Sequence, residues 1–118
     1  MAGARDGTDL DVDPERVAAW LQEDPQLQLV DVREPHEHQA GHIEGARHVP
    51  LAQLPSQVAA ISSEHTVVFY CRVGSRSTMA AQALRASGYQ AYSMSGGLRR
   101  WAQEGRPLVP EAGYVADD

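Results

Sequence analysis

Lysine and asparagine are missing from this sequence, and cysteine occurs once. Because there is no lysine, all ten basic residues are arginine. Without lysine, the chain cannot carry out Schiff-base chemistry or form the phosphate loop that places a lysine on a nucleotide. Without asparagine, it has no N-glycosylation acceptor. A single cysteine excludes an intrachain disulfide and a four-thiolate metal site. Nothing therefore points to an oxidising compartment.

Charge and hydropathy narrow the possible partners. The net charge of -6 disfavours nucleic acid and anionic membranes. The longest apolar run, Val67 to Cys71, is too short to cross a bilayer, and the first thirty residues lack the apolar core of a signal peptide. At 118 residues the chain has the length of one domain. We expect a cytoplasmic protein, a monomer or weak homodimer, with no nucleic-acid or membrane partner.

Short apolar runs alternate with helical patterns along the chain. Residues 66–70 are β-branched and aromatic without polar alternation after Thr66, which is typical of a strand buried on both faces of a parallel sheet. The pattern predicts strands at 26–32, 46–50, 66–70 and 90–94, and helices at 14–22, 51–61 (with Pro55 as a candidate break), 75–87 and 97–104. This alternation predicts an α/β fold with a central, mostly parallel sheet flanked by helices on both faces.

Cys71 lies between the strongest predicted strand and the helix predicted from Ser75, at the sheet edge where such folds bind ligands. Gly74 lets the loop curl so that backbone N–H groups converge on one point, with the positive end of the helix dipole behind them. Arg72 and Arg76 add positive charge, and such surroundings stabilise a thiolate. The usual alternative is a buried structural cysteine. That role needs neither the arginines nor the glycine turn, so we interpret Cys71 as a nucleophile.

Three segments resemble the rhodanese-type sulfurtransferases. The loop CRVGSR (71–76), followed by Ser77, is similar to that family's active-site loop C-R-x-G-x-R, which precedes a small hydroxyl residue. DVREPHEHQAGHIEGARHVP (31–50) and MSGGLRRW (94–101) are similar to two further segments of the family, in its order and spacing. The resemblance implies a rhodanese domain at 11–108. It would lie between a mobile tail at 1–10 and a C-terminal tail at 109–118.

The resemblance also implies an activity and its residues. Cys71 would be the catalytic residue, carrying a sulfane sulfur as a persulfide from a donor such as thiosulfate to cyanide, a thiol or a protein, without a metal or organic cofactor. Asp31 and Arg33 match a structural ion pair of the family, and the segment 41–43 a structural turn. The expected substrate-binding residues are those of the loop, with the two arginines contacting the anion: Arg72, Val73, Gly74, Ser75, Arg76 and Ser77.

Four other interpretations compete with this one. A cysteine phosphatase would need an arginine at the position of Ser77, because its loop is C-x5-R and a shorter loop is too tight for phosphate. His36, His38 and His42 lie within seven residues and could suggest a metal site. Arg99 and Arg100 could form a basic patch, although such a pair is usually a solvated helix face. The domain could also be a regulatory module or a persulfide carrier acting with a protein partner.

Overall fold

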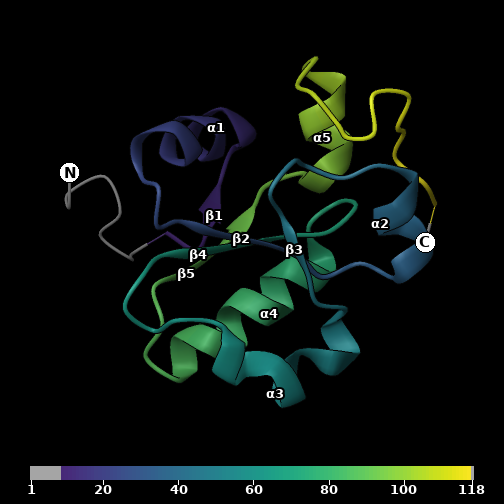
Figure 1. The fold of residues 1–118 in the computed structure, drawn as a ribbon. Coiled ribbons are helices and arrows are strands. Elements are labelled where there is room, and N and C mark those ends of the chain that lie inside the picture. Colours follow the sequence, from purple (N-terminus) through teal and green to yellow (C-terminus); the bar gives the residue numbers. More distant parts are fainter. Residues whose placement is uncertain (1–8, 118) are drawn as a thin grey trace.

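The computed structural model describes residues 9–117, which form a five-stranded parallel sheet with helices on both faces (Figure 1). All neighbouring strands are parallel, and their spatial order is β1-β5-β4-β2-β3. The strands are β1 (Asp11–Val12), β2 (Gln28–Asp31), β3 (Arg47–His48), β4 (Val67–Tyr70) and β5 (Ala91–Met94). The predicted α/β fold is confirmed.

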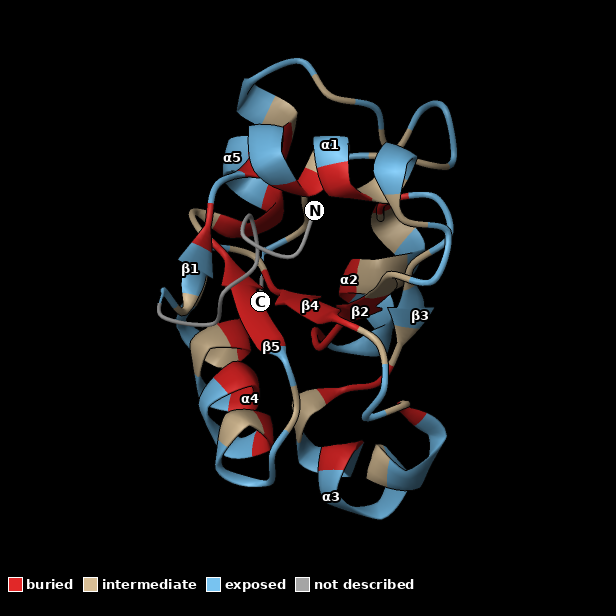
Figure 2. Ribbon diagram, turned by 90° about the vertical axis from the view of Figure 1, so that its left-hand side faces the viewer, coloured by how far each residue is buried: buried red, intermediate tan, exposed pale blue. Residues whose placement is uncertain are grey.

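The helices cover the two faces of the sheet in pairs (Figure 2). On one face, α1 and α5 pack on a cluster that includes Tyr70 and Tyr92. On the other face, α3 and α4 pack on a cluster that includes Phe69 and Cys71. The helices are α1 (Pro14–Glu23), α2 (Pro35–Ala40), α3 (Leu54–Gln57), α4 (Ser75–Ala86) and α5 (Gly97–Gln103).

Strand β4 is the centre of the fold, between β2 and β5. All four of its residues are completely buried, because helices lie over both faces. This burial explains why the run 67–70 has no polar alternation. The residue that follows β4 therefore leaves the sheet at the middle of its carboxyl edge.

Two helical regions differ in detail from the sequence prediction. The helix predicted at 51–61 is split into a 3₁₀ turn at Leu51–Gln53, the short helix α3 and a second 3₁₀ turn at Val58–Ala60. Pro55 lies in the first turn of α3, where a missing N–H costs nothing, so the interruption comes before it. Helix α2 lies outside the ranges predicted above as helical, and it begins with a capping box between Glu34 and Glu37.

The segments at both ends of the described chain contact the domain. The predicted mobile tail at 1–10 falls mostly on residues 1–8, which lie outside the described residues. At the other end, Val109 pairs with His42, and the Tyr114 N–H donates to the Ala40 carbonyl. The domain limits at 11 and 108 stay a prediction.

Within residues 9–117, no helix has the length and apolar character needed to span a bilayer.

Candidate active site

Cys71 lies at the turn between β4 and α4, as the sequence predicted. Gly74 is the N-cap of α4 and has a φ of 116°, in the region that side-chain-bearing residues avoid. This conformation turns the chain back over the cysteine. The thiol is completely buried beneath its own loop.

The sulfur of Cys71 accepts hydrogen bonds from the loop backbone. The Gly74 N–H donates to Sγ at 3.1 Å, and the Ser77 N–H donates to it at 3.4 Å. Both N–H groups belong to the amino end of α4, where the helix dipole is positive. The loop thus offers a negatively charged sulfur the donors that water would otherwise provide.

A chain of hydroxyl groups extends from the sulfur to strand β5. The Ser77 Oγ lies 3.5 Å from Sγ and 2.8 Å from the Ser93 Oγ. Thr78 donates a longer hydrogen bond, 3.4 Å, to the Ser93 Oγ. Ser77 was expected here, whereas Ser93 was not, because only the parallel pairing of β4 with β5 brings it to the loop.

The start of α5 holds the other side of the cysteine loop. The Leu98 N–H donates to the Cys71 carbonyl at 2.8 Å, and the Arg99 N–H donates to the Arg72 carbonyl at 3.0 Å. This approach requires glycine at position 97, where φ is 60° and an added Cβ would lie 2.5 Å from the Arg72 and Cys71 carbonyl oxygens. The sequence pattern predicted a helix at 97–104 but not this contact.

Arg76 forms a two-pronged ion pair with Glu37 of α2. Its two terminal nitrogens lie 2.8 Å and 3.0 Å from the two carboxylate oxygens of Glu37, which is completely buried. Burial alone would raise the pKa of Glu37, but the hydrogen bonds from Arg76 and from the Glu34 backbone hold it below its usual value. Sequence reasoning missed Glu37 as a site residue, since its partner lies 39 positions away.

The remaining predicted residues lie around the rim of the loop. Arg72 is half-buried, and Val73 is exposed, as is Ser75. Arg99 and Arg100 of α5 are exposed, whereas Trp101 of the same helix is buried. Arg100 also pairs with Glu104 at 2.9 Å. The substrate-binding roles of these residues stay predictions.

Asp31 and Arg33 form the expected buried pair at the carboxyl end of β2. The Arg33 Nε and Nη2 donate to the Asp31 carboxylate at 2.8 Å and 2.7 Å, and both side chains are completely buried. Burial would raise the pKa of Asp31, but Arg33 and His38 outweigh it, so this pKa is lowered. Arg33 also donates to the Gly41 carbonyl at 2.8 Å. The pair therefore ties α2 to the edge of the sheet.

Three histidines stack beside this pair. The ring of His38 lies between those of His42 and His48, at centroid distances of 3.8 Å and 4.5 Å. The His38 Nδ1–H donates to Asp31 at 2.8 Å. His36 points elsewhere, toward the Asp117 carbonyl. Within residues 9–117, no group of three or more potential ligands has the arrangement of a metal site.

The stack predicts that the protein loses stability at mildly acidic pH. Burial lowers the pKa of His38 from its usual value of 6.5, and the neighbouring His42 and His48 lower it further, although Asp31 and its hydrogen bond oppose them. The unfolded chain therefore takes up this proton at a higher pH than the folded chain. The stability that comes from keeping His38 neutral is therefore fully present above about pH 6.5. It is lost as the pH falls through the lower pKa that His38 has in the folded protein.

Urea unfolding over a pH series checks this prediction. Asp31 and Glu37 also have lowered pKa values, from 3.8 and 4.5, so their effect is confined to pH below about 4.5. Between pH 6.5 and 4.5, the unfolding free energy of His38→Gln should fall less steeply with falling pH than that of the natural protein. His36→Gln is the matched control, because that exposed ring lies outside the stack. An unchanged slope in His38→Gln would contradict the explanation.

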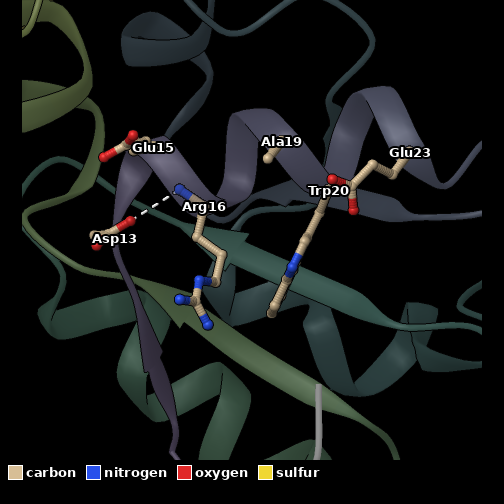
Figure 3. Close-up of a pocket in the computed structure, with 6 residues that line it drawn as sticks. All are labelled: Asp13, Glu15, Arg16, Ala19, Trp20 and Glu23. Carbon is tan, nitrogen blue, oxygen red and sulfur yellow. Dashed lines mark hydrogen bonds between the residues drawn. The ribbon is translucent and has the colours of Figure 1, made fainter. Parts of the chain in front are cut away.

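A groove runs along α1 and is lined by residues of that helix and by its N-cap, Asp13 (Figure 3). None of the lining residues belongs to the cysteine loop. Two side chains that line it already serve the helix itself. The Asp13 carboxylate caps α1 by accepting from the Arg16 N–H at 2.8 Å, and the buried Trp20 packs edge-on against Tyr92 at 5.2 Å. We assign this groove no part in the chemistry.

Comparison with known proteins agrees with this geometry. The chain is 45% identical over 75 residues to the uncharacterized protein YqhL of Bacillus subtilis, and this match spans 63% of the chain and 60% of that protein. It is 34% identical over 104 residues to a sulfurtransferase of Allochromatium vinosum, covering 87% of the chain and 97% of that protein.

The fold has counterparts among solved structures. A rhodanese-related protein from Thermoplasma volcanium superimposes with a TM-score of 0.78 over 84% of this chain and 96% of its own, at 24% identity. The family model for the rhodanese-like domain matches residues 13–104, which include the cysteine loop and all the helices. The chain therefore belongs to the rhodanese-like domain family and has sulfurtransferases among its relatives.

Proposed function

We propose that this chain transfers a sulfane sulfur from a donor such as thiosulfate to an acceptor, through a persulfide on Cys71. One observation carries the proposal: the buried Sγ of Cys71 accepts hydrogen bonds from the backbone N–H groups of Gly74 and Ser77 at the amino end of α4. A cysteine that served only for packing would not need converging donors. The sulfurtransferase relative from Allochromatium vinosum supports the same reaction class.

The proposed reaction has two steps. The Cys71 thiolate attacks the outer sulfur of thiosulfate, the sulfur–sulfur bond of the donor breaks, and sulfite leaves with the electron pair. The product, Cys71–S–S⁻, keeps one negative charge within reach of the loop donors. Cyanide, a thiol or a protein then attacks the outer sulfur and returns Cys71 to the thiolate. Both steps are exchanges of one nucleophile for another, so neither needs an oxidant.

Positive charge near the loop favours the first step. Sulfite leaves as an anion, and preformed donors aimed at a departing anion lower the barrier. We assign this role first to Arg72, which follows Cys71 in the loop and whose carbonyl accepts a hydrogen bond from the Arg99 N–H at the start of α5. Arg76 adds its charge from the first turn of α4, although Glu37 offsets that charge. The negative net charge of the chain, -6, would repel an anionic donor from other surfaces.

Intact-mass analysis tests the proposal directly. The protein is incubated with thiosulfate, the donor is removed, and the mass of the whole chain is measured before and after cyanide. We expect one added sulfur atom that cyanide removes as thiocyanate. A chain whose mass does not change with thiosulfate or with a persulfide donor would overturn the proposal.

The short loop also predicts discrimination against phosphate. From Cys71 to Arg76 the spacing is C-x4-R, one residue shorter than a phosphatase loop, so an aryl phosphate should be turned over negligibly beside thiosulfate. Inserting a glycine between Ser75 and Arg76 should impair sulfur transfer and admit arsenate or phosphate as a ligand. Colorimetric phosphatase and thiocyanate assays on both proteins check this. Efficient phosphate hydrolysis by the natural loop would show that loop length does not decide the chemistry.

A further inference from the structure

Three hydroxyl groups lead from strand β5 to the sulfur of Cys71. The Thr78 hydroxyl donates to the Ser93 Oγ at 3.4 Å, and the Oγ atoms of Ser93 and Ser77 lie 2.8 Å apart. The Ser77 Oγ in turn lies 3.5 Å from the Cys71 Sγ. Ser77 is completely buried and Ser93 is 1% exposed. The oxygen beside the sulfur therefore has a buried partner on a different element of the fold.

Packing alone does not explain a serine at position 93. All four residues of β5 are buried, and Ala91, two positions earlier, belongs to the apolar cluster on which α4 packs. Because side chains alternate along a strand, Ser93 faces the same side of the sheet as Ala91. Burying a hydroxyl there costs free energy unless it forms hydrogen bonds. Alanine would pack at this position as well, so the distinguishing property of Ser93 is its hydrogen bond to Ser77.

The contacts give these hydroxyl groups a direction. Each hydroxyl has one hydrogen to donate. Thr78 donates to Ser93, and the short contact of Ser93 is with Ser77, so the Ser93 hydrogen is directed at the Ser77 Oγ. Ser77 cannot then return its own hydrogen to Ser93. Its other two acceptors are the Gly74 carbonyl oxygen at 3.2 Å and the Cys71 Sγ, and both belong to the cysteine loop.

The charge on the sulfur decides between these two acceptors. A charged acceptor forms a stronger hydrogen bond than a neutral one, so the Ser77 hydrogen turns to Sγ when Sγ is negative. When Sγ is bonded to a second sulfur, the charge of the persulfide lies on the outer atom and Sγ accepts more weakly. The Gly74 carbonyl, 3.2 Å away, then takes the hydrogen bond. The Ser77 hydroxyl thus responds to the state of the cysteine.

We infer that Ser93 is a positioning residue for the step that discharges the persulfide, because it directs the Ser77 hydroxyl to Sγ as that atom becomes the leaving group. The inference rests on the proposed function. When cyanide is the acceptor, its carbon bonds to the outer sulfur, the Sγ–S bond breaks, and the electron pair of that bond stays on Sγ. Thiocyanate leaves and Sγ regains its negative charge. A donor aimed at Sγ stabilises this developing charge.

The same hydroxyl should not accelerate the loading step. When the thiolate attacks thiosulfate, Sγ loses charge as the new sulfur–sulfur bond forms. A hydrogen bond to Sγ is therefore weaker in that transition state than before it, and it gives no acceleration. The two steps should depend differently on Ser93, whereas a variant that only disturbed the fold would slow both of them.

Single-turnover measurements separate the two steps. Loading is followed after mixing with thiosulfate, and discharge after the donor is removed and cyanide is added, with the sulfur content of quenched samples measured by intact mass. Ser93→Ala should slow discharge by about threefold to tenfold, the value of one neutral hydrogen bond. Its loading rate, measured on the high-pH plateau where the thiolate fraction no longer changes, should not fall.

Further variants show whether Ser93 acts through Ser77. Ser77→Ala should slow discharge at least as much, and adding Ser93→Ala to it should cause no further loss, because the hydroxyl to be directed is already gone. Ser93→Thr restores a hydroxyl and should recover most of the discharge rate. Ser95→Ala is the matched control. Ser95 lies two residues after Ser93, outside this chain of hydroxyl groups, and its loss should leave both rates unchanged.

The outcomes distinguish this inference from the proposed function. If the natural protein never gains sulfur, the proposed function falls and the role of Ser93 with it. If the natural protein loads and discharges, but Ser93→Ala slows loading as much as discharge or leaves discharge unchanged, only the role of Ser93 is overturned. Additive losses from Ser77→Ala and Ser93→Ala would overturn it in the same way.

Discussion

Replacing Cys71 with serine should give a folded protein that takes up no sulfur and forms thiocyanate only at the uncatalysed rate. Serine is nearly the same size and can accept the same N–H groups from Gly74 and Ser77, so the loop should keep its shape. Its oxygen cannot hold a sulfane sulfur as a persulfide. Because this is the only cysteine of the chain, no second thiol can substitute for it.

Two measurements check this result together. Thermal unfolding should show a change in stability within about 1 kcal/mol, as for a conservative substitution. Intact mass after thiosulfate and the thiocyanate assay should both show no transfer. Turnover near that of the natural protein in Cys71→Ser would mean that another group carries the sulfur.

Arg76→Ala should have the second largest effect, and it should reduce both stability and activity. Removing Arg76 leaves Glu37 as a completely buried carboxylate without its main partner. Breaking a buried pair on one side costs about 3 to 5 kcal/mol. We also expect kcat/KM for thiosulfate to fall by about tenfold to a hundredfold, the value of one charge-assisted hydrogen bond to the donor.

A double variant separates these two losses. Glu37→Gln combined with Arg76→Met removes both charges, so unfolding free energy should return to within about 1 kcal/mol of the natural protein. If Arg76 contacts the donor, kcat/KM for thiosulfate stays low in the double variant, and an uncharged persulfide donor is affected less. Arg72→Ala is the comparison at the other loop arginine and should lose less. Equal losses for charged and uncharged donors would assign Arg76 to loop support instead of donor binding.

The central part of the fold could be predicted from local sequence. The uninterrupted run Val67–Tyr70 is typical of a strand covered on both faces, and β4 is such a strand. The helix predicted from Ser75 is α4, which begins at that residue. Strand β1 could not be predicted, because its two residues have no periodicity of their own and form a strand only by pairing with β5.

The site was less accessible to sequence reasoning than the fold. The position of Cys71 follows from its neighbours, whereas its supports come from distant segments. Glu37, Ser93 and Gly97 each reach the loop through the topology of the sheet or the packing of a helix, and no local pattern indicates such contacts. His48 likewise joins the histidine stack through the topology of the sheet, because β3 pairs with β2 and so lies beside α2.

The burial of a single thiol also determines how this chain would respond to oxidative damage. Peroxide converts a thiolate first to a sulfenic acid, and a nearby second thiol normally traps that acid as a disulfide before it oxidises irreversibly. None of the other 117 positions offers such a thiol. The loop over Sγ is therefore the protection that the chain itself provides, and recovery of an oxidised Cys71 depends on a thiol brought by another molecule.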